Sequence, residues 1–264
     1  NREGERVFNY ATQAVRQPGS TAKPLFDYGP GFEYNDFSTY TLFNDEPWTY
    51  TNGPSVGNWD GKYQGLITLR RALSVSRNVP ALKAFQQVDK KNIAKFVTSL
   101  GIDIAYSNKD DNYKEYDNGG NNLLNEAYSI GGMSYGVTPL DMAEAYASFA
   151  NGGYHIESHA VTKIEYRNSD KVIVTNELEE YQKEKVMSDS TAYLMNNVLQ
   201  YAVEYAFSGG ARVYGSTVAA KTGTSNLPEA TCRAKGIPVG SVADLWTVAY
   251  TPEYSVALWY GYKE

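Results

Sequence analysis

The sequence contains few of the side chains that build disulfides and metal sites. Its 264 residues include one cysteine, Cys232, and two histidines, His155 and His159. A single cysteine excludes a disulfide within the chain, and so few sulfur and nitrogen ligands argue against a dedicated zinc site. We therefore expect a protein that works without a bound metal and without another cofactor.

The sequence also lacks a run of about 20 apolar residues, the length that a membrane-spanning helix needs. It opens without a signal peptide, begins at Asn1 and stops at Glu264 inside an expected strand. We therefore expect a piece of a longer protein that is trimmed at both ends.

An excess of positive charge is missing as well. Lysine and arginine number 24 against 30 aspartates and glutamates, which leaves a net charge of −6. Such a chain does not present the basic surface that nucleic-acid binding requires. Hydrophobic residues make up 42% of the chain, enough for the core of one large globular domain.

The predicted secondary structure changes along the chain from helices to strands. Helices are expected over 20–28, 69–75, 80–88, 90–100 and 139–150, and from Ser188 or Asp189 to 206. Strands are expected over 218–224, 244–250 and 254–262, a hairpin over 159–175, a long ordered loop over 29–65 and a surface excursion over 103–125. Because helices and strands do not alternate, this order favours an α+β fold in which a helical region packs on an antiparallel sheet.

Ser20 and Lys23 lie three residues apart at the start of the first expected helix. Positions i and i+3 share one face of a helix, so the Lys23 amine can reach the Ser20 hydroxyl. The positive end of the helix dipole favours a nucleophilic serine there. A capped helix start explains the same residues, because Ser-x-x-Lys occurs about once by chance in a chain of this length.

Ser76 and Asn78 flank Arg77 at a bend between two expected helices. In such a place a hydroxyl can relay a proton, and an amide can hold a substrate carbonyl and a lysine head. The alternative is a loop whose serine and asparagine bond the backbone of the helix ends.

Lys221-Thr222-Gly223-Thr224 lies on an expected strand. Alternation places Lys221 and Gly223 on one face of the strand and the two threonines on the other. An edge strand of this kind can pair with an extended peptide and hold its carboxylate between lysine and threonine groups. A strand that runs into a turn explains the same residues.

Together the three motifs form a specific set. The order Ser-x-x-Lys, Ser-x-Asn, Lys-Thr-Gly is typical of penicillin-binding proteins and class A β-lactamases, whose second motif is Ser-Asp-Asn. Arg77 in place of that aspartate favours the transpeptidase members. The chain resembles the transpeptidase domain of a class A, bifunctional penicillin-binding protein. The segments that carry the resemblance are 8–24, 67–83, 131–153, 218–226 and 245–262.

The resemblance implies the α+β fold of penicillin-binding proteins and serine β-lactamases, with residues 1–264 as one transpeptidase domain. It also implies an upstream glycosyltransferase domain and a membrane anchor that holds the protein at the extracytoplasmic face of a bacterial cell membrane. Earlier N-terminal strands and a C-terminal helix would complete the sheet. Two departures are Ser208-Gly209-Gly210-Ala211, where the family usually has Gly-Thr-Gly, and the long loop 227–243.

The resemblance also assigns roles within the site. Ser20 becomes the nucleophile, Lys23 its base and Ser76 the group that passes the proton to the leaving amine. Asn78 would hold Lys23 and a side-chain amide of the donor peptide. The remaining assignments are the carboxylate-binding residues Lys221, Thr222 and Thr224, Gly223 as a point of close backbone approach, and the backbone N–H groups of Ser20 and Thr224 as an oxyanion hole.

Such an enzyme is a D,D-transpeptidase that is acylated by a peptidoglycan stem peptide ending in D-Ala-D-Ala and transfers the acyl group to an amine of a neighbouring stem. Carboxypeptidase side activity, inhibition by β-lactams and partners among other cell-wall synthesis proteins follow from the same resemblance. Two alternatives stay open. A serine β-lactamase needs a deacylating base, for which Glu126 and Glu144 are the nearest acidic candidates, and a penicillin-sensing module would acylate without transfer.

Overall fold

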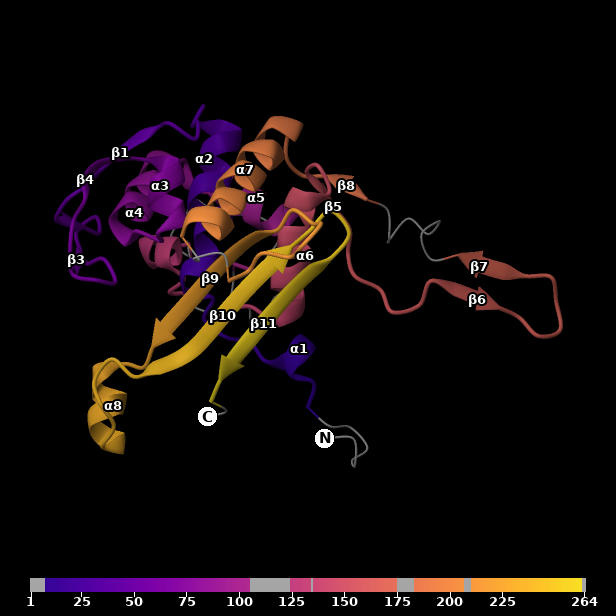
Figure 1. Cartoon of the computed structure of the whole chain (residues 1–264). Helices are drawn as coiled ribbons and strands as arrows, with labels where there is room; N and C mark the ends of the chain where they lie inside the picture. Colours follow the sequence, from indigo (N-terminus) through magenta and orange to yellow (C-terminus); the bar gives the residue numbers. More distant parts are fainter. Residues whose placement is uncertain (1–7, 105–123, 134, 175–182, 207–209, 263–264) are drawn as a thin grey trace.

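The computed structural model describes residues 8–104, 124–133, 135–174, 183–206 and 210–262. They form a helical region and an antiparallel sheet that pack together, with a hairpin arm projecting from the body (Figure 1). The α+β fold that the order of the elements predicts is confirmed.

The main sheet is made by the three strands that were predicted for the end of the chain. They are β9 (Ala219–Asn226), β10 (Val242–Tyr250) and β11 (Ser255–Gly261), in the antiparallel order β11-β10-β9. Lys221 pairs with Val248 and Gly223 pairs with Trp246. Within the described residues β9 has a neighbour on one side alone, so the Lys-Thr-Gly motif lies on an edge strand.

Helical segments build most of the remaining body. They are α1 (Tyr10–Gln13), η1 (Gly19–Ala22), η2 (Pro24–Tyr28), α2 (Gly29–Tyr34), α3 (Leu69–Ser74), α4 (Asn78–Gln87), α5 (Lys90–Ser99), η3 (Glu126–Ile130), α6 (Pro139–Ala150), α7 (Asp189–Tyr205) and α8 (Glu229–Lys235). Helix α6 packs on β10 and β11, whereas α7 packs on β9 and α3. In the described ranges, none of these helices has the length and hydropathy of a membrane span.

The helix starts follow from local side-chain chemistry. Thr68, Asp89, Thr138 and Ser188 each accept a hydrogen bond from a backbone N–H two or three residues further on. Thr138 and Asp141 form a complete capping box at the start of α6.

The helix expected over 80–88 begins two residues earlier than predicted. Helix α4 begins at Asn78, and Arg77 is its N-cap residue with an extended backbone. Pro80 is tolerated in this first turn because the backbone N–H that it lacks would have no partner there.

The prediction of a long loop over 29–65 is wrong in part. The helical path that begins at η1 continues through η2 into α2, because Pro30 lies in the first turn of α2, where a missing N–H has little effect. The chain then forms two short antiparallel pairs. These are β1 (Leu42–Asp45) with β4 (Gly65–Thr68), and β2 (Trp48–Thr49) with β3 (Ser55–Val56).

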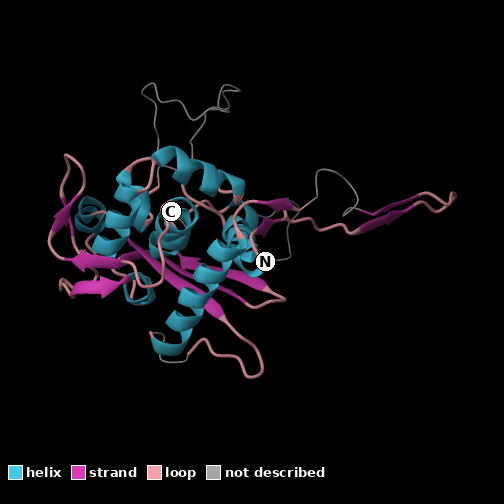
Figure 2. Cartoon of the chain, turned by 90° about the horizontal axis from the view of Figure 1, so that it is seen from above, coloured by secondary structure: helices cyan, strands magenta, loops and turns pink. Residues whose placement is uncertain are grey.

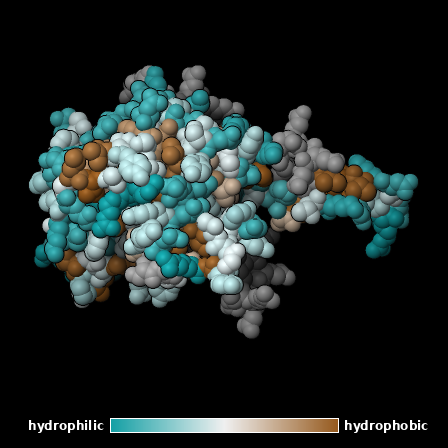
Figure 3. Space-filling model, turned by 45° about the horizontal axis from the view of Figure 1, so that its top comes forward, coloured by the Kyte–Doolittle hydropathy of each residue, from teal (hydrophilic) through white to brown (hydrophobic). Residues whose placement is uncertain are grey.

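The predicted hairpin is present as β6 (Lys163–Glu165) paired with β7 (Val172–Val174), and it projects far from the body (Figure 2). Hydrophobic side chains are visible on this arm in Figure 3. Ile164 and Val172 of the hairpin are both exposed. Strands β5 (Tyr154–His155) and β8 (Glu184–Lys185) pair near its base. Most of the excursion expected over 103–125 lies outside the described residues.

Two glycines allow η1 to lie in backbone contact with its neighbours. A Cβ on Gly223 of β9 would lie 2.3 Å from the Pro18 carbonyl oxygen. Gly131 ends η3 with a φ of +85°, and a Cβ there would lie 2.1 Å from the Gly19 carbonyl oxygen. Neither position has room for a side chain, so η1 is held between β9 and η3.

We expect Gly131→Ala to lower the free energy of unfolding by about 2–5 kcal/mol, because it adds steric overlap to the strain of a positive φ. Gly152→Ala is the matched control, since Gly152 also has a positive φ, +63°, but open space around it. Urea unfolding measures both variants. Equal losses of stability in the two variants would contradict the contact with Gly19.

Candidate active site

Ser20 lies in the turn η1 and is partly exposed, while the three residues after it are buried. The Thr21 hydroxyl donates a hydrogen bond of 2.7 Å to the Pro18 carbonyl. The Tyr146 hydroxyl donates one of 2.7 Å to the Thr21 carbonyl. These bonds hold the turn in place, and within the described residues they leave the Ser20 hydroxyl without a hydrogen bond.

The chain that leads into η1 is anchored on two sides. The Gln17 side chain accepts a bond of 2.7 Å from the Met133 N–H and donates one of 2.8 Å to the Met133 carbonyl. The Trp246 indole donates to the Gln17 carbonyl at 2.8 Å. Arg16 and Val137 exchange backbone hydrogen bonds of 2.9 and 2.8 Å. The anchors come from the sheet and from the segment that precedes α6.

Two buried lysines meet at Ser76. Lys23 Nζ donates to the Ser76 carbonyl at 2.8 Å, to Ser76 Oγ at 3.3 Å and to Asn78 Oδ1 at 2.8 Å. Lys221 Nζ donates to Ser76 Oγ at 2.9 Å and to the Thr222 carbonyl at 2.8 Å. The structure therefore joins residues from all three sequence motifs in one hydrogen-bonded cluster.

Ser20 takes no part in the hydrogen bonds of this cluster within the described residues. No hydrogen bond connects Ser20 Oγ with Lys23 Nζ, although the two residues lie one turn apart on the same segment. Catalytic hydrogen bonds of this kind often tighten only when substrate binds.

Burial lowers the pKa of both lysines. The pKa of Lys23 falls well below its usual value, first because the side chain is buried and second because Lys221 repels its charge. The pKa of Lys221 falls to about 7 because of burial. This shift favours the neutral form of Lys23, which is the form that a general base requires.

Asp27 was not singled out from the sequence, although it follows Lys23 by four residues, a spacing that places both on one helix face. Its carboxylate is buried, and neither oxygen has a hydrogen-bond partner among the residues that the structure describes. Burial raises the pKa of Asp27 well above its usual value, while the charge of Lys23 acts in the opposite direction. A negative charge on Asp27 would in turn raise the pKa of Lys23.

Arg77 explains why the bend at Ser76 is rigid. Its buried guanidinium bonds Asp45 at 2.8 Å and Asp60 at 2.9 Å and also donates to the Lys62 carbonyl. Ser76 itself has a φ of +60°, a conformation that non-glycine residues adopt only when the surroundings hold them there. In the sequence Arg77 served only to favour the transpeptidase members. Its supporting role was not predicted, because its partners lie in the segment 29–65 that was expected to be a loop.

Asn58 connects the same support to the second motif. Asn58 Oδ1 accepts a bond of 2.8 Å from the Asn78 N–H, and Asn58 Nδ2 donates to Asp45 at 2.7 Å. The Asn78 side chain donates to the Gly57 carbonyl at 2.8 Å, which orients its oxygen towards Lys23.

The alternation predicted for the third motif is confirmed. Lys221 and Gly223 are buried, whereas Thr222 and Thr224 are exposed along the edge strand. A Cβ on Gly19 would lie 2.8 Å from the Thr224 nitrogen. The backbone of Gly19, which precedes Ser20, is therefore in contact with the backbone of Thr224.

The two acidic candidates for a deacylating base are bound elsewhere. Glu126 accepts hydrogen bonds from the Thr51 N–H and hydroxyl at 2.7 and 2.6 Å. Glu144 accepts one from the Ser158 N–H at 3.0 Å. Neither carboxylate forms a hydrogen bond with the lysine cluster, which weakens the β-lactamase alternative.

The long loop 227–243 contains helix α8, and Cys232 is buried there with Sγ 3.8 Å from the Leu227 carbonyl oxygen. Of the departure at 208–211, residues 208 and 209 lie outside the described chain. The described residues contain no group of three or more His, Cys, Asp or Glu side chains placed to hold a metal ion.

Comparison with known proteins defines the class. The family model of the penicillin binding protein transpeptidase domain matches residues 1–260, and the chain belongs to this family. The resemblance seen in the sequence motifs is thereby confirmed.

Curated relatives are similar over nearly the whole chain. Penicillin-binding protein 1A/1B of Bacillus subtilis is 41% identical over 259 residues, which are 97% of this chain and 26% of the relative. Penicillin-binding protein 1A of Streptococcus pneumoniae is 35% identical over 262 residues, 97% of this chain and 34% of the relative. The chain thus spans about a quarter to a third of these relatives.

Solved structures show the same fold. The penicillin-binding protein PonA1 from Mycobacterium tuberculosis superposes with a TM-score of 0.75 at 23% identity, covering 97% of this chain and 62% of that one. Penicillin-binding protein A from the same organism, as its imipenem acyl-enzyme, superposes with a TM-score of 0.74 at 18% identity, covering 96% and 57%.

We expect Arg77→Met to lower the free energy of unfolding by about 3–5 kcal/mol, because it leaves the carboxylate of Asp45 buried without its cation. Asp45→Asn added to Arg77→Met should recover part of this loss. Arg71→Met is the control, since Arg71 is exposed on α3. Urea unfolding of the wild type, the two single variants and the double variant tests the ion pair between Arg77 and Asp45. An Arg77→Met protein as stable as Arg71→Met would contradict the role of this ion pair.

Proposed function

We propose that this chain is a serine D,D-transpeptidase domain that cross-links peptidoglycan stem peptides and is acylated by β-lactams. The observation that carries the proposal is a pair of buried lysines, Lys23 and Lys221, that both donate to Ser76 Oγ in a member of the transpeptidase family. Lys23 lies one turn from Ser20. Structures of relatives described as complexes with penicillin V and as a penicillin G acyl-enzyme support the covalent step.

The proposed acylation begins at Ser20. Its Oγ attacks the carbonyl carbon of the penultimate D-Ala, and its proton passes to neutral Lys23. The backbone N–H groups of Ser20 and Thr224 stabilise the developing oxyanion. Ser76, which contacts both lysines, delivers a proton to the leaving D-Ala amine as the peptide bond breaks.

Substrate binding is assigned to the edge strand and to Asn78. The charge of Lys221 and the exposed hydroxyls of Thr222 and Thr224 bind the terminal carboxylate of the donor. Gly223 keeps the strand close to η1. Asn78 binds an amide of the donor peptide while its oxygen holds Lys23.

We also propose that residues 1–264 are one transpeptidase domain of a longer class A protein. The names of the curated relatives and a neighbour described as the transpeptidase domain of a peptidoglycan glycosyltransferase from Eggerthella lenta support this assignment. A protein of that kind acts at the extracytoplasmic face of the cell membrane, among other cell-wall synthesis proteins.

Fluorescent penicillin tests the nucleophile. Ser20→Ala should lower the rate of covalent labelling by at least about a thousandfold, because it removes the oxygen to which the acyl group is proposed to bond. Ser148→Ala is the control, since it removes a serine hydroxyl on α6, outside the lysine cluster. Label that persists in Ser20→Ala would contradict the assignment, and rapid penicillin turnover would favour a β-lactamase.

The pH dependence of acylation tests Lys221. The second-order rate constant reports groups of the free enzyme, so it should fall as the pH rises through about 7, where Lys221 loses the charge that attracts the carboxylate. A penicillin methyl ester lacks this carboxylate and should show no such fall. Parallel profiles for the acid and the ester would contradict a charged role for Lys221.

A further inference from the structure

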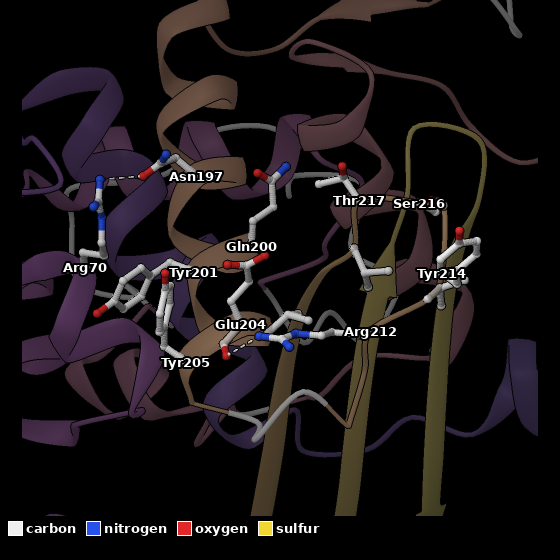
Figure 4. A pocket seen from close by; sticks show the side chains of 14 residues that line it. Arg70, Asn197, Gln200, Tyr201, Glu204, Tyr205, Arg212, Tyr214, Ser216 and Thr217 are labelled. Carbon is white, nitrogen blue, oxygen red and sulfur yellow. Dashed lines mark hydrogen bonds between the residues drawn. The ribbon is translucent and has the colours of Figure 1, made fainter.

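A cavity of about 780 Å³ lies beside the segment that leads into β9 (Figure 4). Its walls are the C-terminal half of α7, Arg70 of α3 and residues 212–218. None of the lysine-cluster residues lines it. The cavity therefore needs an explanation separate from the acylation site.

Arg70 gives the cavity a fixed positive charge. Its guanidinium lies over the rings of Tyr40 and Tyr201, 5.3 and 5.4 Å from their centroids, and donates to Asn197 Oδ1 at 2.7 Å. Its Nε is buried and has no acceptor among the described residues, so a ligand in the cavity meets the charge of the guanidinium and not this N–H group.

Arg212 adds a second guanidinium. It is exposed, and one of its N–H groups donates to the Glu204 backbone carbonyl at 3.1 Å (Figure 4). Two arginines and one carboxylate, Glu204, line the cavity. This local excess of positive charge, in a chain of net charge −6, selects for an anionic ligand.

The other lining groups suit a peptide. The rings of Tyr201 and Tyr205 lie 4.5 Å apart and form an aromatic wall. The side chains of Gln200, Ser216 and Thr217 line the cavity as well and can bond amide groups. An aromatic wall, hydroxyls and guanidinium groups together match a carboxylate-bearing peptide.

The place of the cavity along β9 suggests which peptide binds. The last lining residue, Val218, precedes Lys221 by three residues, about 10 Å along a strand. In the proposed reaction Lys221, Thr222 and Thr224 hold the carboxylate of the leaving D-Ala, while the backbone N–H of Thr224, the last of the three, lies at the reacting carbonyl. The leaving group thus lies towards the start of β9, and the amine that replaces it enters from that side.

We propose that the cavity lined by Arg70, Arg212 and Tyr201 binds a carboxylate of the acceptor stem peptide. This inference rests on the proposed transpeptidase function. The acceptor amine attacks the acyl carbon, an amide bond forms, the ester bond to Ser20 Oγ breaks, and a proton of the amine returns to Ser20 Oγ through Lys23. The cavity positions the acceptor and takes no part in the bond changes.

The test uses a thioester donor and two acceptors that differ in one group. The acceptors are a lysine-containing peptide with one free side-chain amine and a free C-terminal carboxylate, and the same peptide as its C-terminal amide. We expect the wild-type domain to show a KM about tenfold lower for the carboxylate acceptor, the effect of one charge-assisted hydrogen bond. Arg212→Gln should remove this preference by raising the KM of the carboxylate acceptor alone.

Arg233→Gln is the matched control, because Arg233 is an exposed arginine on α8 that bonds a neighbouring glutamate. It should keep the preference for the carboxylate acceptor. If the preference is absent in the wild type, or survives in Arg212→Gln, the cavity does not bind the acceptor carboxylate. The inference is also overturned if the preference between the two acceptors depends on which thioester donor is used.

The proposed function and the assignment of the cavity are contradicted by different results. If penicillin and the thioester do not acylate Ser20, the proposed function is wrong. If acylation occurs but the two acceptors have equal KM values, only the assignment of the cavity is wrong. Acylation followed by hydrolysis alone, with neither acceptor used, contradicts both transfer and the acceptor site.

Discussion

The site depends on two lysine side chains that are buried beside the same serine hydroxyl. Lys23 and Lys221 both donate to Ser76 Oγ, and both are removed from solvent. Burial lowers the pKa of each amine, and the charge of Lys221 lowers the pKa of Lys23 further. The same burial that destabilises the charged lysines favours a neutral amine one turn from Ser20.

The scaffold around the cluster holds it in place through close backbone packing and a buried ion pair. Gly223 and Gly131 allow η1 to touch β9 and η3, which fixes Ser20 relative to the strand. On the other side, Arg77 is held by Asp45 and Asp60 and keeps Ser76 in a left-handed conformation. Because these supports lie on different elements, the site forms only when the helical region and the sheet have packed together.

Much of the fold was accessible from the sequence because its signals are local. Caps such as Thr138 and Ser188 act within three residues, and the alternation on β9 needs only the strand itself. The prediction failed over 29–65, where the short strand pairs depend on contacts with distant segments. The partners of Arg77 were missed for the same reason. Asp27 was missed although its spacing from Lys23 is local, because only the folded structure shows that its carboxylate is buried.

The sequence by itself determined the three motifs, their order and the family, because these depend on residue identity and spacing alone. Only the tertiary structure decided that Lys23, Ser76, Asn78 and Lys221 meet, since hydrogen bonds between residues up to 145 positions apart cannot be inferred from local pattern. It also decided that Arg77 is a buried support and that Arg70 and Arg212 face one cavity. Burial and charge proximity exist only after the chain has folded, and they set the pKa values on which the chemistry depends.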